Sequence, residues 1–314
     1  MDSIRTNFAA MTALQSLQAT NKELVKSQQR ISTGYRVATA EDNAAYWSIS
    51  TTMRSDNKAL STVMDALGLG SATVDVAFTA LNSAIDVTTE IKAKLVAARE
   101  PGIDRGRIQD ELTELQNQLQ SIADSAVFSG QNWLSVDSAA IGYNATKSIV
   151  SSFSRAADGT IEIGTIGFAI DDAKLYDASA TSDGILDAMR DATGARSGTG
   201  TFAIGTLDIS TLTDSATDLA TLEEYIKGAD TAISEMTAAG SSLGSVKQRI
   251  GLQENFIGVL MDAIDRGISA LVDADMNEES TRLQALQVQQ QLGIQALSIS
   301  NSSSQSILSL FRNG

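Results

Sequence analysis

The residues best suited to chemistry in this chain are its carboxylates, because the sequence contains neither histidine nor cysteine. Histidine is the commonest general base near neutral pH and the commonest zinc ligand, so catalytic triads and histidine-based metal sites are excluded. Without cysteine there is neither a disulfide framework nor a thiolate metal site. Carboxylate chemistry stays open, and the acidic segments are therefore the first candidates.

The densest acidic segment is DADMNEES at residues 273–280. Alternating carboxylates of this kind are found in calcium loops, but an EF-hand loop needs glycine at position six and glutamate at position twelve. Counted from Asp273, these positions hold Glu278 and Gln284. Acidic side chains are also favoured in the first turn of a helix, where they oppose the helix dipole. We therefore expect a solvated linker followed by a helix start, and no metal ion.

Two smaller patterns are equally weak as sites. Glu41 and Asp42 are adjacent, and neighbouring carboxylates on one backbone seldom converge on a substrate. Gly68 and Gly70 lie inside a helical stripe, whereas a phosphate-binding loop joins a strand to a helix start. These glycines indicate close helix packing or a local bend. We predict no catalytic, cofactor-binding or metal-binding residues, and hence no enzyme.

Composition favours a helical assembly protein. Of the 314 residues 43% are hydrophobic but only 5% aromatic, a mix that suits helix bundles and coiled coils. The net charge of −15 opposes binding to nucleic acid or to an anionic membrane surface. The sequence has no run of about 18 apolar residues, so no membrane span is predicted. The first residues lack the pattern of a secretory signal, so export would require another route.

Both ends of the chain carry heptad-like helical spacing with amides inside the seam. We predict terminal coiled-coil helices at 1–31 and 281–314, although an ordinary amphipathic helix of a globular bundle would show a similar pattern. Isolated helices of this kind are marginal in water, so they should become ordered when many copies meet. The predicted contact positions are Leu14, Leu17, Leu24, Ile31, Leu286, Ile294, Leu297, Leu308 and Phe311.

Longer helical patterns lie inward of these ends, at 44–136 and 217–271. Pro101 and Gly102 mark a turn after which a second helix folds back on the first. A helix of about fifty residues spans roughly 75 Å, which is unusual for a compact domain. We therefore predict a helical rod whose core contains Leu81, Ile85, Leu112, Leu115, Leu119, Ile233, Ile250, Ile257 and Ile264.

The middle of the chain, residues 137–216, turns to Ser, Thr, Gly, Asp and β-branched residues. Two strands joined at Asp158-Gly159 are predicted there, because Asp-Gly is a typical hairpin turn. Another short strand is expected within 193–210. Apart from scattered aspartates, this insert holds a single glutamate, Glu162, which offers little to a carboxylate-dependent enzyme, the rival from another functional class.

The layout is symmetric about the insert, so the two chain ends can pack side by side. We predict a mainly α fold: a long antiparallel helical rod or coiled coil formed by both ends, with a small β-containing insert. Paired linkers at 32–43 and 272–280 would join its two segments. Gly34 permits the turn, Asp42 or Asn43 can cap the next helix, and Tyr46 and Trp47 can anchor the joint against a neighbouring subunit.

Several separated motifs stand out at the two ends of the chain: the residues at 3–50, FSGQNWL at 128–134, LGSVKQRI at 243–250, ISALVDADMNEES at 268–280 and QSILSLFR at 305–312. These motifs resemble the terminal signatures of bacterial flagellins, the filament subunits, particularly of the rhizobial or alphaproteobacterial type that forms complex filaments. The resemblance covers roughly 1–135 and 218–314.

The resemblance implies that the terminal helices form the inner tube of a flagellar filament, the rod its outer wall, and the insert its exposed surface. It also implies unfolded export without a cleaved signal peptide to an extracellular, rotating filament that drives swimming. The implied partners are further copies of the chain, related flagellins, the flagellar export apparatus, the filament cap, hook-junction proteins and an export chaperone at the C-terminus. A hook–filament junction protein is the nearest alternative, and an adhesive role of the insert is a further one.

The chain departs from the common flagellin pattern at two places that receptors read in other flagellins. At the first break it has Glu41 with the bulky Tyr46 and Trp47, where the common pattern reads Lys-Asp-Asp-Ala-Ala-Gly-Leu. In the segment 88–99, Glu90 stands where an arginine is expected. These departures argue against recognition by plant and Toll-like flagellin receptors.

Overall fold

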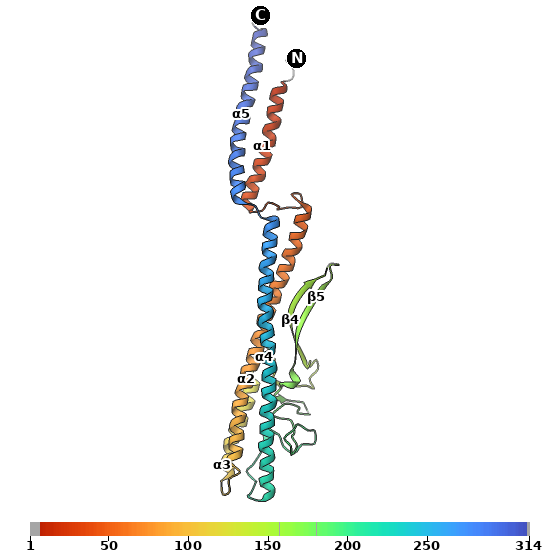
Figure 1. Cartoon of the computed structure of the whole chain (residues 1–314), viewed down its shortest axis with the longest axis vertical. Helices are drawn as coiled ribbons and strands as arrows, with labels where there is room; N and C mark the ends of the chain where they lie inside the picture. The colour runs from red at the N-terminus through yellow and green to blue at the C-terminus, as the bar shows by residue number, and fades with distance from the viewer. Residues whose placement is uncertain (1–6, 157, 180, 313–314) are drawn as a thin grey trace. The chain divides into compact units, whose positions relative to one another are not determined.

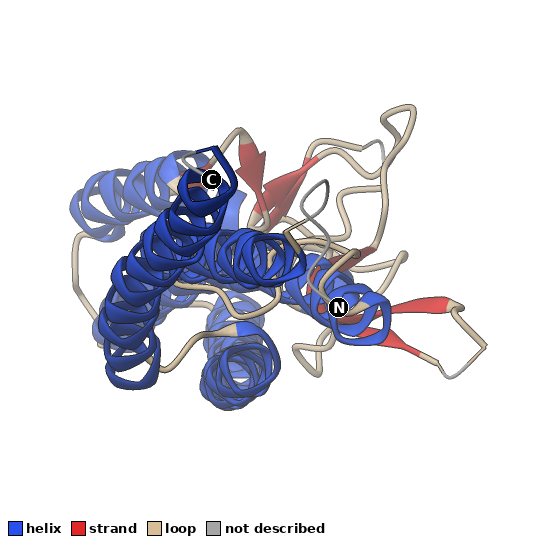
Figure 2. Ribbon diagram, turned by 90° about the horizontal axis from the view of Figure 1, so that it is seen from above, coloured by secondary structure: helices blue, strands red, loops and turns tan. Residues whose placement is uncertain are grey.

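The computed structural model describes residues 7–156, 158–179 and 181–312, and for 304–312 it describes the helix without its side chains. The described chain is dominated by five α-helices (Figures 1 and 2), which confirms the predicted mainly α fold. Their bounds are α1 Phe8–Thr33, α2 Ala44–Ala97, α3 Arg105–Ser125, α4 Ala216–Val272 and α5 Met276–Arg312. Contacts divide the chain into two compact units, one from residues 1–58 and 261–314, the other from residues 59–260.

In the first unit, α1 and α5 form an antiparallel pair (Figure 1). The side-chain amide of Asn7 donates to the carbonyl of Ser300 at 3.1 Å, and that of Gln290 donates to Asn21 at 2.7 Å. Residue numbers therefore rise along one helix as they fall along the other. The second contact is a solvent-exposed amide pair that bridges the two helices, and a directional bond of this kind favours one register. Amides inside the seam stay a prediction.

The second unit is built on α2, α3 and α4. Asp75 of α2 meets Lys247 of α4 at 2.6 Å, and Lys92 meets Asp230 farther along, so these two helices are also antiparallel. The chain turns at Gly102, whose φ of +79° lies in the left-handed region that glycine adopts most easily. Helix α3 then returns beside α2, as the fold-back at Pro101-Gly102 predicts.

The core of the second unit follows the predicted stripe. Of the predicted core residues, Leu81, Leu112, Leu119, Ile250 and Ile257 are buried, and Ile85, Leu115 and Ile233 are half-buried. Ile264, also half-buried, belongs to the first unit. Burying each large apolar side chain contributes about 1.5–3 kcal/mol, so the stripe accounts for much of the packing between the helices.

The insert contains the predicted hairpin. Strands β4 (Thr146–Arg155) and β5 (Ile161–Ala169) pair antiparallel, and Gly159 in the connecting turn has a φ of +88°. An irregularity between Val150 and Ser152 shifts the register by one residue. The inner face rests on α2, because a Cβ built on Gly70 would lie 2.4 Å from Ile149. Gly70 is thus required by close packing, one of the two explanations that its helical context suggested.

Three short strands precede the insert: β1 (Val127–Phe128) pairs with β2 (Gln131–Asn132), and β3 (Ser135–Val136) pairs with β6 (Tyr176–Asp177) of the insert. The insert also holds the 3₁₀ turns η1 (Ile170–Asp172) and η2 (Ile204–Thr206). The strand expected within 193–210 is wrong. Phe202 makes only an isolated bridge to Arg190, and its ring packs against α4, where a Cβ on Gly228 would lie 2.6 Å away. Its apolar residues fill a core instead of alternating along a sheet.

The two breaks between helices differ in length. The first covers residues 34–43, close to the predicted 32–43, but the second covers only 273–275 instead of 272–280. Helix α5 begins at Met276 because Asp275 accepts the backbone N–H groups of Asn277 and Glu278, at 2.8 and 3.3 Å. The acidic residues of 276–280 therefore belong to the first turn of α5.

Candidate functional site

The two breaks, residues 34–43 and 273–275, meet at the end of α4, and we call this meeting point the joint. The last four carbonyls of a helix have no partner inside it. Here Ser269 accepts from the N–H of Asp273, while the Arg36 guanidinium donates to the carbonyls of Ala270 and Leu271 at 3.3 and 3.1 Å. The backbone N–H groups of Arg36 and Val37 donate to Val272 at 2.7 and 3.2 Å. All four carbonyls are thus satisfied, mostly from the first break, which links the breaks directly. The sequence pattern did not single out Arg36.

Gly34 ends α1 in the way the sequence predicts. Its φ of +76° is left-handed, and its N–H donates to the carbonyl of Arg30 at 2.8 Å, which closes the last turn. Its own carbonyl accepts from the N–H of Ala274 at 2.9 Å. Because a Cβ at this position would meet no heavy atom within 4 Å, backbone conformation rather than space favours glycine.

The two predicted capping residues have different tasks. Asn43 accepts from the backbone N–H groups of Ala45 and Tyr46, both at 3.1 Å, and so caps α2. Asp42 instead folds the loop before it, accepting from Ala38 and neighbouring backbone, and lies 3.7 Å from Lys26. Burial on its own would raise the pKa of Asp42, but these hydrogen bonds and nearby positive charge lower it below its ordinary value.

The predicted anchors Tyr46 and Trp47 remain 41% and 40% exposed. Two large aromatic side chains at the start of a helix, left in contact with water, are available to another molecule. Tyr35, which was not among the predicted anchors, is also exposed, and the Arg54 guanidinium lies 4.9 Å from the centre of its ring. The subunit contact predicted for Tyr46 and Trp47 stays a prediction.

A charged cluster ties α1 to α5 beside the joint. Glu279 is only 5% exposed and accepts from Arg30 at 2.7 Å and from the hydroxyl of the buried Ser27 at 2.9 Å. Burial on its own would raise the pKa of Glu279, yet the hydrogen bonds from Arg30 and Ser27 and the charges of Arg30 and Arg282 lower it. The acidic segment therefore contributes an ion pair and a helix cap, not convergent ligands.

The α1–α5 pair leaves much of its predicted contact surface open. Leu24 is buried, Leu17, Ile31, Leu286 and Leu297 are half-buried, and Leu14 and Ile294 are exposed; the side chains of Leu308 and Phe311 lie outside the described residues. Two paired helices can bury only one stripe each. Among the described residues, the large apolar side chains still exposed on the pair are Phe8, Met11, Leu14, Val25, Met276, Val288, Leu292, Ile294 and Ile299.

Two properties bear on other classes of function. Within the described residues, no group of three or more acidic side chains is arranged to hold a metal ion. Helix α2 is long and apolar enough to cross a membrane by length and composition alone, a property that the apolar runs of the sequence did not indicate. Core helices of soluble proteins pass the same test, and α2 buries Leu67, Leu81 and Ile91 within its own unit.

Comparison with known proteins gives a family for this arrangement. The model of the bacterial flagellin N-terminal helical region matches residues 4–139, and that of the bacterial flagellin C-terminal helical region matches residues 226–311. Flagellin C of Rhizobium meliloti (strain 1021) is 52% identical, over 99% of this chain and 100% of the relative. Flagellin A of the same strain and a flagellin of Brucella melitensis biotype 1 are each 41% identical, with the same coverage of both chains.

The matched regions contain nearly all of the helices described above, and the segment between them carries the β4–β5 hairpin. A surface of exposed apolar side chains on paired terminal helices is what a self-assembling structural subunit requires. The chain belongs to the bacterial flagellin family, as a rhizobial-type subunit that polymerises into the flagellar filament used for motility.

Proposed function

We propose that the α1–α5 pair forms the inner tube of the filament, with the predicted segments 1–31 and 281–314. The segments 44–136 and 217–271 would form the outer wall, the joint of 32–43 with 272–280 the spoke between them, and 137–216 the exposed surface. The exposed apolar residues on α1 and α5 are the observation that carries this proposal.

The reason is energetic. In an isolated pair of helices the exposed large apolar side chains stay in water. Full burial of each would contribute about 1.5–3 kcal/mol of stabilising free energy. Leu14 and Ile294, two of the predicted tube contacts, are 44% and 53% exposed. Only further copies with the same surface are present in sufficient number to bury this stripe along its whole length. Polymerisation therefore completes a core that one subunit cannot close.

The same reasoning supports a non-catalytic role at an extracellular site, since the family is a structural one. The flagellar export apparatus, the filament cap, hook-junction proteins and a C-terminal export chaperone are the further partners that we propose, with no nucleic acid or membrane partner. Export without a cleaved signal peptide is part of this proposal. Glu41, Tyr46 and Trp47 are expected to weaken recognition by plant receptors, and Glu90 recognition by Toll-like receptors.

The test is seeded polymerisation of purified chain, measured as the concentration of monomer that remains when growth stops. Leu14→Asp and Ile294→Asp should each raise this critical concentration by tenfold or more, since burying a charge at a subunit contact is costly. Gln15→Asp and Gln291→Asp, at exposed positions beside them, are the matched controls. Removal of residues 1–30 or 285–314 should leave a soluble monomer. Filaments grown from either truncated chain would refute the tube assignment, and growth without limit distinguishes a filament subunit from a junction protein.

A further inference from the structure

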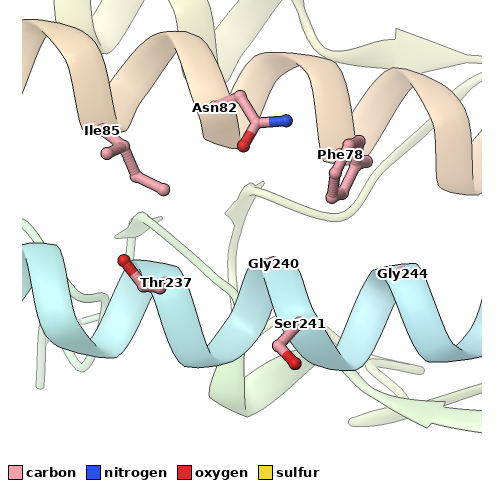
Figure 3. Close-up of a pocket in the computed structure, with 7 residues that line it drawn as sticks. All are labelled: Phe78, Asn82, Ile85, Thr237, Gly240, Ser241 and Gly244. Atoms are coloured by element: carbon pink, nitrogen blue, oxygen red, sulfur yellow. The ribbon is translucent and has the colours of Figure 1, made fainter.

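A groove runs between α2 and α4 in the second unit (Figure 3). Phe78 and Ile85 from α2 project into it from one side, and α4 lines the other side with residues that have little or no side chain. The full lining is Phe78, Asn82, Ile85, Thr237, Gly240, Ser241 and Gly244. None of these residues is charged, so an apolar side chain could enter without desolvating an ion.

The two glycines keep the groove open. A Cβ on Gly240 would come no closer than 3.6 Å to Leu81, and one on Gly244 would meet no heavy atom within 4 Å. Neither glycine is therefore required by packing within the subunit. In a helix interior, glycine costs about 0.5–1 kcal/mol relative to alanine. Two such residues one turn apart, opposite Phe78 and Ile85, leave a space that the subunit itself does not fill.

The same unit carries an apolar surface of the opposite shape. Leu252, Phe256 and Val259 of α4 are 65%, 60% and 66% exposed. Their spacing of four and then three residues places them on one face of the helix. We call these three residues the α4 ridge. Large apolar side chains this exposed, grouped on one helix face, mark a surface that another molecule covers.

We infer that the α4 ridge of one subunit inserts into the α2–α4 groove of the next subunit in the filament, with Phe256 as the central side chain. The inference deepens the proposed function and rests on it. A helical polymer needs a heterologous contact, in which two different surfaces of the same chain are complementary, because such a contact continues from copy to copy. Groove and ridge provide one apolar concave surface and one apolar convex surface within a single unit.

The occupant is a second copy of the chain for two reasons. The subunit polymerises with itself, so each groove meets identical neighbours at high local concentration. The chain also supplies the complementary surface in a one-to-one ratio, so every groove along the filament can be filled. A contact of ridge with ridge would be isologous and would end at a dimer.

The first test fills the groove. Gly244→Met places a side chain in the groove without a clash inside the subunit, and Gly68→Met is the matched control, because its Cβ also meets nothing within 4 Å but lies outside the groove. Gly244→Met should raise the critical concentration for seeded growth about tenfold or more, as Phe256→Ala should. Gly68→Met should change it little, and circular dichroism melts of the monomers should show that all three variants fold.

The second test uses the absence of cysteine in the natural chain. Asn82→Cys lies in the groove and Val259→Cys on the ridge, and both leave Phe256 in place. Filaments of the double variant, oxidised and then dissolved in denaturant, should give a ladder of dimers, trimers and longer chains. Each single variant should give monomers only. Dimers from Val259→Cys alone would show a contact of ridge with ridge and overturn the inference.

The proposed function and the contact between ridge and groove fail in different ways. If the unmodified chain does not polymerise, the proposed function itself is wrong. Suppose instead that the unmodified chain polymerises, that Gly244→Met and Phe256→Ala have its critical concentration, and that the double-cysteine variant gives no ladder. In that case only the contact between ridge and groove is wrong.

Discussion

Replacement of Glu279 by alanine should loosen the α1–α5 pair far more than replacement of its neighbour Glu278. Glu279→Ala leaves the Arg30 guanidinium, whose side chain is 20% exposed, without its carboxylate partner. The buried Ser27 hydroxyl keeps only its longer bond to the carbonyl of residue 279, at 3.3 Å. Breaking a buried ion pair costs about 3–5 kcal/mol, and the remaining exposure of Arg30 places this case near 3 kcal/mol. Glu278 is exposed in the first turn of α5, so its loss removes only a dipole interaction of about 0.3–1 kcal/mol.

The assay is hydrogen exchange of the α1 and α5 amides in polymerised protein, read by mass spectrometry, with the helices of the second unit as internal reference. A loss of 3 kcal/mol corresponds to roughly a hundredfold faster exchange through local opening. Glu278→Ala should change the rate less than about tenfold. Equal exchange rates in the two variants would refute the claim that the Glu279 cluster holds the pair together.

The same cluster predicts a dependence on pH. The folded-state pKa of Glu279 is lowered from its ordinary value of 4.5. A lowered carboxyl pKa means that the stabilisation is complete above pH 4.5 and is lost as the pH falls through the lower folded value. The difference in exchange between unmodified chain and Glu279→Ala should therefore shrink below pH 4.5, whereas a difference that stays constant there would show that charge is not its source.

Three further outcomes are expected. Gly70→Ala should lower the melting temperature of the monomer, because overpacking against the hairpin costs about 1–3 kcal/mol and outweighs the gain in helix propensity; Gly68→Ala, in open space, should raise stability by up to about 1 kcal/mol. Arg190→Ala should make the insert sensitive to limited proteolysis, because this fully buried guanidinium donates hydrogen bonds to two backbone carbonyls and to Glu235. Arg196→Ala removes only a partly exposed ion pair and should lower the free energy of unfolding by about 0–1 kcal/mol. Trp47→Ala should leave the monomer melt within about 0.5 kcal/mol yet raise the critical concentration for growth, and unchanged growth would contradict its predicted subunit contact.

The helices could be predicted from the sequence because their apolar residues recur every three or four positions. Leu81, Leu119 and Ile250 are buried where the apolar stripe places them. Gly34 was also predictable, since a glycine after a helical run is the usual left-handed terminus. These features depend on local spacing and backbone preference, which a single sequence displays directly.

The features that could not be predicted depend on partners distant in the sequence. Arg36 looks like any exposed arginine until the end of α4, more than 230 residues away, supplies the carbonyls that it binds. The apolar residues around Phe202 alternate as a strand would, but they pack against Gly228 and its neighbours instead of pairing at a sheet edge. Nothing in their own spacing distinguishes the two cases.

The joint and the helix surfaces use different interactions, and this difference suits assembly. At the joint the hydrogen-bonding groups of the two breaks bind each other: Arg36 caps α4, and Gly34 binds Ala274. Such directional bonds fix the geometry of the unit before any neighbour arrives. The apolar residues that remain exposed, such as Trp47 and Ile294, are non-directional in their attraction. A subunit that satisfies the backbone groups of its joint internally and leaves apolar side chains exposed gains free energy from polymerisation mainly by burying surface, without first breaking the hydrogen bonds of the joint.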